Sequence, residues 1–364
     1  MPKTLENLSV VFFVAVGVIL VTQNSSAQTT VAVGNCGPHL VTYTTISEAV
    51  AAVTPNSTVF VCPGTYPEQV TIAQPLILMG LKSATGAEPV ITVPSGGLLG
   101  DDVQLSVQGT ADAPFAVNIS NLSVDGTGSG VECSTGSVTG IKYEFASGTI
   151  EHVNVRHQSP GGCGIGIELL GGLFVVNTVN VLESRIEDFD ESGISASSDG
   201  ATGFLVNLTS NSVVSLQPVV QSGIEYFMTD GVAERNSVVL SGGTGIDLLN
   251  FFSGMTARRN TVIGATIGII AGTNEGLTPT SIDGNYLFKN GTGILVFFSG
   301  ERIVKANAIV LSSTTAINLD CADQVVAENN QIFGAPVGIA NISSEDILTG
   351  NTFFDVTTAT SACP

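Results

Sequence analysis

The chain has 364 residues, of which 31 are acidic and 11 basic, so its formal net charge is −20. This charge excludes nucleic acid and an anionic membrane surface as partners, because both would repel the chain. It also disfavours polyanionic sugars unless a cation bridges the two surfaces. The hydrophobic fraction of 43% is large enough to form a packed core.

The first predicted element is a cleavable signal peptide at residues 1–27. Lys3 supplies a positive charge, residues 8–21 form an apolar run, and residues 25–27 (SSA) suit a signal peptidase. A membrane anchor needs about 18 apolar residues, and neither this run nor any later one is that long. We therefore expect a secreted protein, whether extracellular, surface-bound or periplasmic, with no stable membrane span after cleavage.

Six cysteines in an exported chain predict three disulfides. They fall into three neighbourhoods of the sequence, which favours the pairs Cys36–Cys62, Cys133–Cys163 and Cys321–Cys363, although other pairings stay open. A metal site built on these cysteines is disfavoured, because the chain has no CxxC motif and only three histidines.

Residues 44–53 (TTISEAVAAV) form the single convincing predicted helix. Hydroxyl side chains stand at its start, Glu48 lies in its first turn, and Ala and Val share one face. We interpret this helix as the N-terminal cap of a solenoid. Residues 28–114 then contain the cap and the first coils, and residues 115–364 contain the repeats of the same continuous domain.

Two short motifs recur in phase through the second region. The dipeptide Gly-Ile, once Ala-Ile, appears at spacings of 22 to 30 residues, at Gly140, Gly166, Gly193, Gly223, Gly245, Gly268, Gly293, Ala316 and Gly338. An asparagine that precedes a β-rich run alternates with it, at Asn121, Asn154, Asn180, Asn211, Asn236, Asn260, Asn285, Asn307, Asn330 and Asn351.

This period predicts an all-β fold, a single-stranded right-handed parallel β-helix of roughly ten coils. Each period contains β-rich runs of three to five residues between Gly, Ser, Asn and Asp, and no helix-length amphipathic segment. Stacked coils place equivalent residues about 4.8 Å apart. Aligned asparagines can then hydrogen-bond from coil to coil, so we interpret them as structural rather than catalytic.

The segment after the predicted helix resembles the start of the pectin-lyase-like β-helix proteins. Pectin methylesterases share its pattern of a strand, Pro-Gly-x-Tyr-x-Glu and a second strand that ends in Leu-x-Gly, here Pro63, Gly64, Tyr66, Glu68 and Leu78 to Gly80. The resemblance covers about 45 residues closely and implies the β-helix fold.

The catalytic segments of that family are missing. The chain has no Trp, no Gln-Asp pair in the required context and no Asp-Phe-Ile-Phe-Gly segment, and the signatures of polygalacturonase-like enzymes are missing too. We expect Glu68 to hold the first turn rather than to act in chemistry. Residues 187–192 (EDFDES) are interpreted as a solvated acidic turn.

The best candidate site is the outward face of the Gly-Ile strands. If each Ile points inward, the next residue points outward, which gives Lys142, Glu168, Ser195, Glu225, Asp247, Ile270, Leu295, Asn318 and Ala340. Two residues further, the outward positions are Glu144, Leu170, Ser197, Phe227 and Leu249. Carboxylates therefore gather on the middle coils.

These residues predict a protein that binds a polysaccharide along this face. Glu168, Glu225 and Asp247 are the candidate catalytic carboxylates, with Arg156 or Arg185 as the cation. Glu144, Phe227 and Lys142 are candidate ligand contacts. Carboxylates on neighbouring coils suit glycoside hydrolysis, and close pairs could instead hold Ca²⁺. No organic cofactor is required.

Three functional alternatives stay open on the sequence. One is binding of a polysaccharide without turnover, and the second is a lyase, hydrolase or pectin esterase-like enzyme that acts on such a polymer. The third is a structural or surface-display rod, because acidic residues on a chain with 31 of them also serve solubility.

Overall fold

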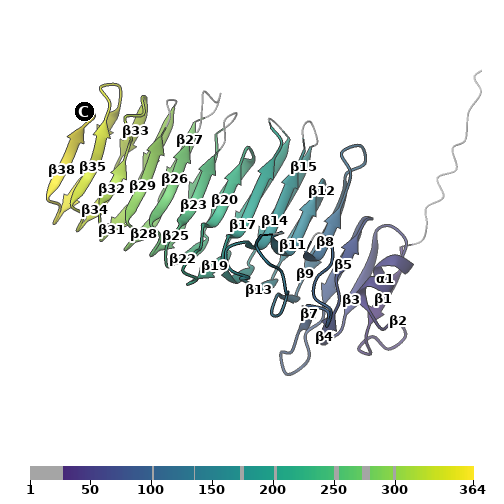
Figure 1. Ribbon diagram of the computed structural model, residues 1–364. Helices are drawn as coiled ribbons and strands as arrows, with labels where there is room; N and C mark the ends of the chain where they lie inside the picture. The colour runs from purple at the N-terminus through teal and green to yellow at the C-terminus, as the bar shows by residue number, and fades with distance from the viewer. Residues whose placement is uncertain are drawn as a thin grey trace, which may run out of the picture.

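The computed structural model describes residues 28–100, 102–134, 136–172, 176–200, 203–249, 254–272, 279–297 and 301–364. The predicted signal peptide lies outside these residues. The chain winds into an elongated stack of coils, with the single helix of the described residues at one end and the C-terminus at the other (Figure 1). Every pair of neighbouring strands in the stack is parallel, and each coil contributes one strand to each of three sheets.

The three sheets are named A, B and C in the order in which the chain visits them. Sheet A consists, in spatial order, of β2 (Val41–Tyr43), β1 (Thr30–Val33), β3 (Ser57–Val61), β6 (Leu76–Gly80), β9 (Phe115–Ser120), β12 (Ala146–Glu151), β15 (Asn177–Leu182), β18 (Phe204–Thr209), β21 (Asp230–Glu234), β24 (Thr256–Arg258), β27 (Thr280–Asp283), β30 (Arg302–Lys305), β33 (Val325–Glu328) and β36 (Ile347–Thr349).

Sheet B consists of β4 (Gly64–Pro67), β7 (Pro89–Thr92), β10 (Ser123–Asp125), β13 (Asn154–Gln158), β16 (Arg185–Phe189), β19 (Ser212–Ser215), β22 (Ser237–Leu240), β25 (Thr261–Ile263), β28 (Tyr286–Phe288), β31 (Ala308–Val310), β34 (Gln331–Phe333) and β37 (Thr352–Phe354). Sheet C consists of β5 (Val70–Ile72), β8 (Val103–Gln108), β11 (Val138–Glu144), β14 (Gly164–Gly171), β17 (Ser192–Ser198), β20 (Ser222–Phe227), β23 (Thr244–Leu249), β26 (Ile267–Gly272), β29 (Thr292–Phe297), β32 (Thr315–Asn318), β35 (Val337–Ile342) and β38 (Thr358–Ala362).

This nearly all-β architecture with three long parallel sheets is consistent with the predicted right-handed parallel β-helix. Sheets B and C have 12 strands each, so the described residues form 12 coils rather than the roughly ten expected. The difference arises because β5, β8 and β38 belong to the same sheet but lack the Gly-Ile dipeptide that marks the other coils.

The Gly-Ile dipeptides lie in sheet C, and their isoleucines form one line through the core. The nine residues Ile141, Ile167, Ile194, Ile224, Ile246, Ile269, Ile294, Ile317 and Ile339 are all fully buried. A glycine precedes eight of them, with Ala316 before Ile317, and the small residue is needed because the next coil passes so close. A Cβ atom at Gly245 would lie 2.2 Å from Val262 Cγ1 and 2.4 Å from the carbonyl oxygen of Gly268.

Seven asparagines form a continuous ladder at the corner between sheets A and B, as predicted for a structural role. Asn260 is typical: its Nδ2 donates to the carbonyl oxygen of Ala233 at 2.9 Å, and its Oδ1 accepts from the backbone N–H and the Nδ2 of Asn236 at 2.9 and 3.0 Å. The members are Asn211, Asn236, Asn260, Asn285, Asn307, Asn330 and Asn351.

Three asparagines assigned to this series are not on the ladder. The coil before Asn211 presents Ser184 at the ladder position, with its backbone N–H bonded to Asn211 Oδ1 at 3.0 Å. Asn180 lies on β15 instead and accepts from Asn207. Asn154 lies one residue beyond the ladder position, and Asn121 precedes it by one residue, because Val153 and Leu122 hold the equivalent places.

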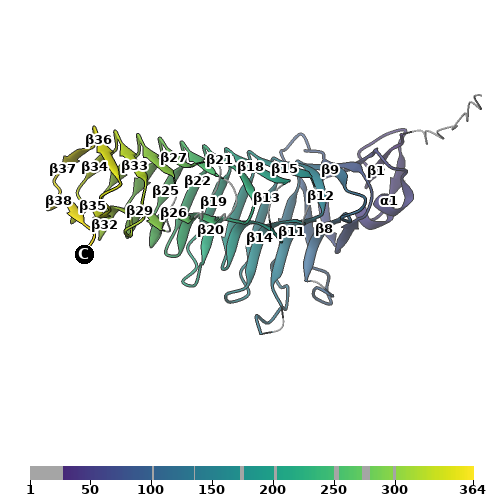
Figure 2. The same ribbon diagram turned by 90° about the horizontal axis from the view of Figure 1, so that it is seen from above.

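Helix α1 (Ile46–Ala52) is shorter than the predicted segment 44–53 and lies beside the first strands of sheet A (Figure 2). Its Ile46, Ala49 and Val50 are buried. Glu68 has the structural role expected of it, because its carboxylate accepts the backbone N–H groups of Ile46 and Ser47 at 2.8 and 2.9 Å. These groups are unpaired at any helix N-terminus, and a carboxylate there is favoured by the helix dipole.

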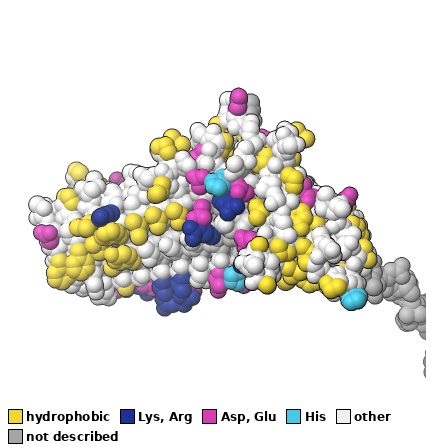
Figure 3. Space-filling model, turned by 90° about the horizontal axis from the view of Figure 1, so that it is seen from below, with side chains coloured by type: hydrophobic (Ala, Val, Ile, Leu, Met, Phe, Trp, Pro, Cys, Tyr) yellow, Lys and Arg dark blue, Asp and Glu magenta, His cyan; other side chains and the backbone are white. Residues whose placement is uncertain are grey.

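The outer face of sheet B changes character along the stack. One column of side chains starts with the charged residues Asp125, Arg156 and Glu187, which are in register on successive strands. It continues with the apolar residues Val214, Val239, Ile263, Phe288, Val310, Phe333 and Phe354. Hydrophobic side chains accordingly gather over the C-terminal part of the face shown in Figure 3, with charged ones nearer its middle.

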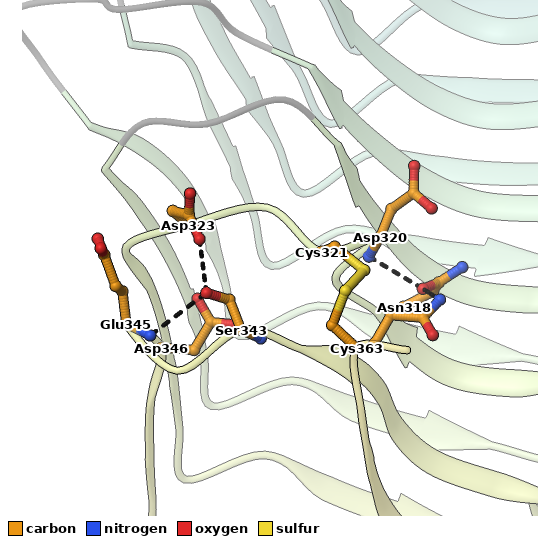
Figure 4. Close-up of a disulfide and its surroundings, with 9 residues drawn as sticks. Asn318, Asp320, Cys321, Asp323, Ser343, Glu345, Asp346 and Cys363 are labelled. Atoms are coloured by element: carbon orange, nitrogen blue, oxygen red, sulfur yellow. Dashed lines mark hydrogen bonds between the residues drawn. A yellow bond between two sulfur atoms is a disulfide. The ribbon is translucent and has the colours of Figure 1, made fainter.

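All three predicted disulfides are present: Cys36–Cys62, Cys133–Cys163 and Cys321–Cys363. The last one joins Cys363, the residue after β38, to the turn that follows β32 (Figure 4). Next to it, Ser343 donates a hydrogen bond to Asp323 at 2.5 Å. The coil that contains β38 is therefore tied covalently to a neighbouring turn.

Across the described ranges, we find no helix with the length and apolar character that crossing a membrane requires.

Candidate functional site

The outward face of sheet C carries two columns of side chains in register. The first column runs Lys142, Glu168, Ser195, Glu225, Asp247, Ile270, Leu295, Asn318 and Ala340. The second runs Glu144, Leu170, Ser197, Phe227 and Leu249. Both predicted series are confirmed as neighbours on adjacent strands, because strict stacking preserves the alternation between inward and outward residues.

Lys142 is the cation of the first column. Its Nζ lies 3.7 Å from Glu168 Oε2 and 3.9 Å from Glu144 Oε2, and the side chain is only 18% exposed. Burial raises the pKa of the Glu168 carboxyl, Lys142 lowers it and Glu144 raises it, and the net pKa is raised. These three side chains form a compact group across β11 and β14.

Glu225 and Asp247 lie side by side on β20 and β23. Glu225 Oε2 accepts a hydrogen bond from Ser192 Oγ at 3.0 Å. Burial, and then the charge of Glu225, raises the pKa of Asp247 to about 7. Within the described residues, Asp247 Oδ1 is buried and has no hydrogen-bond partner. At neutral pH, Asp247 therefore exists in both protonation states and can donate or accept a proton.

Glu191 belongs to the same group, although residues 187–192 are predicted from the sequence to form a solvated acidic turn. That interpretation was wrong: Phe189 and Asp190 are buried, and burial together with the charges of Glu225 and Glu168 raises the pKa of Glu191. The signal that could have located it is the apolar Phe189 just before Gly193-Ile194, which indicates a buried strand end.

Arg156 and Arg185 are not brought to this face. They lie on β13 and β16 of sheet B, where Arg156 Nε donates to Asp125 at 2.9 Å and Arg185 pairs with Glu187. In the described part of the chain, no contact supports either arginine as the cation beside the sheet C carboxylates. Lys142 occupies that place.

Residues 204–361 match the family model of NosD, described as a periplasmic copper-binding protein. The match covers less than half of the chain. No curated protein matches the sequence.

Several solved structures share the fold over most of their length. The surface adhesin PfbA of Streptococcus pneumoniae is 14% identical, with 86% of this chain and 85% of that chain covered and a TM-score of 0.58. The A-module of mannuronan C-5 epimerase AlgE6 from Azotobacter vinelandii is 15% identical over 84% and 93%, with a TM-score of 0.55. DFA-IIIase from Arthrobacter chlorophenolicus A6 is 15% identical over 78% and 85%, with a TM-score of 0.52.

At these identities the similarity concerns the fold. The chain is a parallel β-helix protein with the fold of the pectin-lyase-like proteins, as its N-terminal motif and its repeats predicted.

Proposed function

We propose that this protein binds a linear polysaccharide along the outward face of sheet C. The observation that carries the proposal is the unbroken run of polar side chains in the first column, from Lys142 through Asp247, with Phe227 37% exposed in the column beside it. The run repeats at the strand spacing of about 4.8 Å, so an extended polymer can contact one coil after another. Among proteins of this fold, one is named a mannuronan epimerase and another a surface adhesin.

The charge of the face selects a neutral polymer. Five carboxyl groups share this face with Lys142, and only Glu144 and Glu168 lie next to it; the others are Glu191, Glu225 and Asp247. An anionic polysaccharide would therefore be repelled unless Ca²⁺ bridged the carboxylates. Hydroxyl groups of a neutral sugar can donate to these carboxylates, and Phe227 offers an apolar surface to a sugar ring.

Glu225→Gln should weaken polysaccharide binding about tenfold, as expected when a charged hydrogen-bond acceptor becomes neutral. The measurement is retention on a panel of neutral and anionic polysaccharides, with and without Ca²⁺. Asp283→Asn is the matched control, because Asp283 lies on sheet A and pairs with Lys305 at 3.9 Å. A rod without ligand function would show no selective retention, and equal binding by both variants would contradict the assignment of the face.

Catalysis is the second candidate, and the raised pKa of Asp247 favours it. A carboxylic acid with a pKa of about 7 beside a second carboxylate on the adjacent strand has the arrangement of a glycosidase acid and its partner. The same polysaccharides are screened for new reducing ends and unsaturated products. Turnover that Asp247→Asn abolishes would identify a hydrolase or lyase, and no turnover on any polymer would leave binding alone.

Copper binding, which the NosD description names, does not fit the residues of this chain. The matched segment 204–361 contains no histidine, its single cysteine, Cys321, is in a disulfide, and its methionines are only Met228 and Met255, of which Met255 is buried in the core. Copper sites in proteins are built from histidine, cysteine and methionine. Among the described residues, no group of three or more His, Cys, Asp or Glu side chains could hold a metal ion.

We further propose that the protein is exported and that helix α1 caps the N-terminal end of the stack. Three disulfides are typical of an oxidising compartment. Mass spectrometry of the mature chain should find Gln28 as its first residue.

The cap is tested by Glu68→Gln, which should destabilise the fold by about 1 kcal/mol because it removes the charge that pairs with the helix N-terminus. The measurement is the unfolding midpoint in urea. Glu301→Gln is the control, because Glu301 is exposed and precedes β30, many coils away from helix α1. Equal midpoints for wild type and Glu68→Gln would argue against the cap.

A further inference from the structure

A pocket of about 360 Å³ lies at the corner between sheets B and C, apart from the two columns of sheet C. Its walls are the glycine-rich segment 126–131, which follows β10, and Ser159 and Pro160, which follow β13. His157 and Asp188 are the two titratable side chains that line it. They occupy equivalent positions at the ends of β13 and β16 on successive coils.

The imidazole of His157 is oriented by Asp125. His157 Nδ1 lies 2.9 Å from Asp125 Oδ1, and Asp125 also accepts from Thr127 Oγ1 at 2.6 Å and from Arg156 Nε at 2.9 Å. Burial alone would raise the pKa of Asp125, but the hydrogen bonds from Thr127, His157 and Arg156 outweigh it and lower the pKa. A carboxylate only accepts, so Nδ1 carries the hydrogen of the neutral ring and Nε2 is left as an acceptor.

A second acceptor lies beside that Nε2. Asp188 Oδ2 is 3.9 Å from it, which is too far for a direct hydrogen bond. Both side chains are partly exposed, His157 to 45% and Asp188 to 39%. Two acceptors at this separation are bridged best by a ligand with two adjacent donors, such as neighbouring hydroxyl groups on a sugar ring.

The walls of the pocket are held in place by covalent and polar contacts. The disulfide Cys133–Cys163 joins the chain just beyond the two segments that form them. Asp190 accepts the backbone N–H groups of Gly161 and Gly164 at 2.5 and 2.6 Å, which fixes the second segment. A pocket that is already formed loses little conformational entropy when a ligand binds.

We propose that this pocket is a second ligand site, which binds a neutral sugar through a pair of neighbouring hydroxyl groups that donate to His157 Nε2 and Asp188. The hydroxyl groups of Thr127, Ser129 and Ser159 and the backbone of the glycine-rich segment complete a polar lining. Asp188 disfavours an anionic ligand. The site is independent of the polysaccharide face of sheet C, and each can be tested without the other.

The test follows the ring nitrogens of the three histidines by NMR in ¹⁵N-labelled full chain. The probes are methyl glycosides of mannose, galactose, glucose and xylose, with their O-methylated derivatives, which lack hydroxyl donors, as matched controls. We expect a saturable shift of the His157 nitrogens with at least one glycoside and none with its O-methylated form. His152 is an internal control, because it pairs directly with Glu183 at 3.0 Å outside the pocket.

Two variants test the roles of Asp188 and His157 in ligand binding. Asp188→Ala should weaken binding of the glycoside at least tenfold, while the hydrogen bond to Asp125 keeps the His157 ring in its orientation. His157→Gln identifies the ring nitrogen resonances of His157 by their disappearance. The same variant should weaken binding of the glycoside to a similar extent, as measured by ligand-observed NMR. The proposal is overturned if no glycoside shifts His157, if Asp188→Ala binds as well as wild type, or if Zn²⁺ or Ca²⁺ alone shifts His157 while every glycoside is inert.

The two proposals have separate readouts. The His157 ring shift reports only on the pocket, and polysaccharide retention reports only on the face of sheet C. A negative result in one measurement therefore does not contradict the other proposal.

Discussion

Asp247→Asn is expected to stabilise the protein, and to do so more strongly at pH 8 than at pH 5. The folded-state pKa of Asp247 is about 7, whereas the ordinary value is 3.8. Between these two values the folded state binds more protons than the unfolded state, so stability falls as pH rises from about 4 to about 7. The asparagine removes this penalty, and we expect its advantage to be about 2 kcal/mol larger at pH 8 than at pH 5.

The measurement is urea unfolding of wild type and Asp247→Asn at both pH values, with the disulfides intact. Asp283→Asn is the control on sheet A, where the carboxylate is exposed and paired with Lys305. Glu225→Gln gives a second check, because removal of the neighbouring charge should lower the pKa of Asp247. An Asp247→Asn effect that is equal at both pH values would show that the carboxyl does not titrate near neutrality.

Asn260→Ala should cost about 3 kcal/mol of unfolding free energy. The change leaves the carbonyl oxygen of Ala233 without its donor and the backbone N–H of Asn236 without its acceptor, both inside the ladder. Each buried polar group that loses its partner costs about 1–3 kcal/mol. The unfolding midpoint should therefore fall clearly while the circular dichroism of the folded state stays that of a β protein.

Asn154→Ala is the matched control. Asn154 follows the same sequence pattern, but it lies off the ladder and, among the described residues, its buried Oδ1 has no hydrogen-bond partner. Its replacement should change the midpoint much less than that of Asn260. Equal losses at the two positions would show that the ladder bonds contribute nothing beyond side-chain packing.

The repeat alone determined much of this protein. In a stack of parallel coils, residues one period apart become neighbours, so a repeated local pattern also predicts which distant residues are in contact. For this reason the core isoleucines and the outward series from Lys142 to Ala340 could be predicted from positions in the sequence. The three disulfides followed instead from the grouping of the cysteines into three neighbourhoods of the chain. The structural role of Glu68 followed from its place in the Pro-Gly-x-Tyr-x-Glu motif.

The tertiary structure decided what the period does not encode. Spacings vary from 22 to 30 residues, so the register of each coil depends on how its loops are accommodated, which is why Ser184 and not Asn180 precedes Asn211 on the ladder. The face on which a charged residue lies depends on the sheet that its strand joins. Arg156 and Arg185 lie on strands of sheet B and not beside the carboxylates of sheet C.

Burial and electrostatic environment are also set only by the assembled fold. Nothing in the local sequence shows that Asp247 is buried beside Glu225, that Glu191 turns toward the same group, or that His157 and Asp188 meet at a pocket. The pKa of a carboxyl depends on solvent exclusion and on charges from other coils, and both arise when strands 22 to 31 residues apart in the chain pack together.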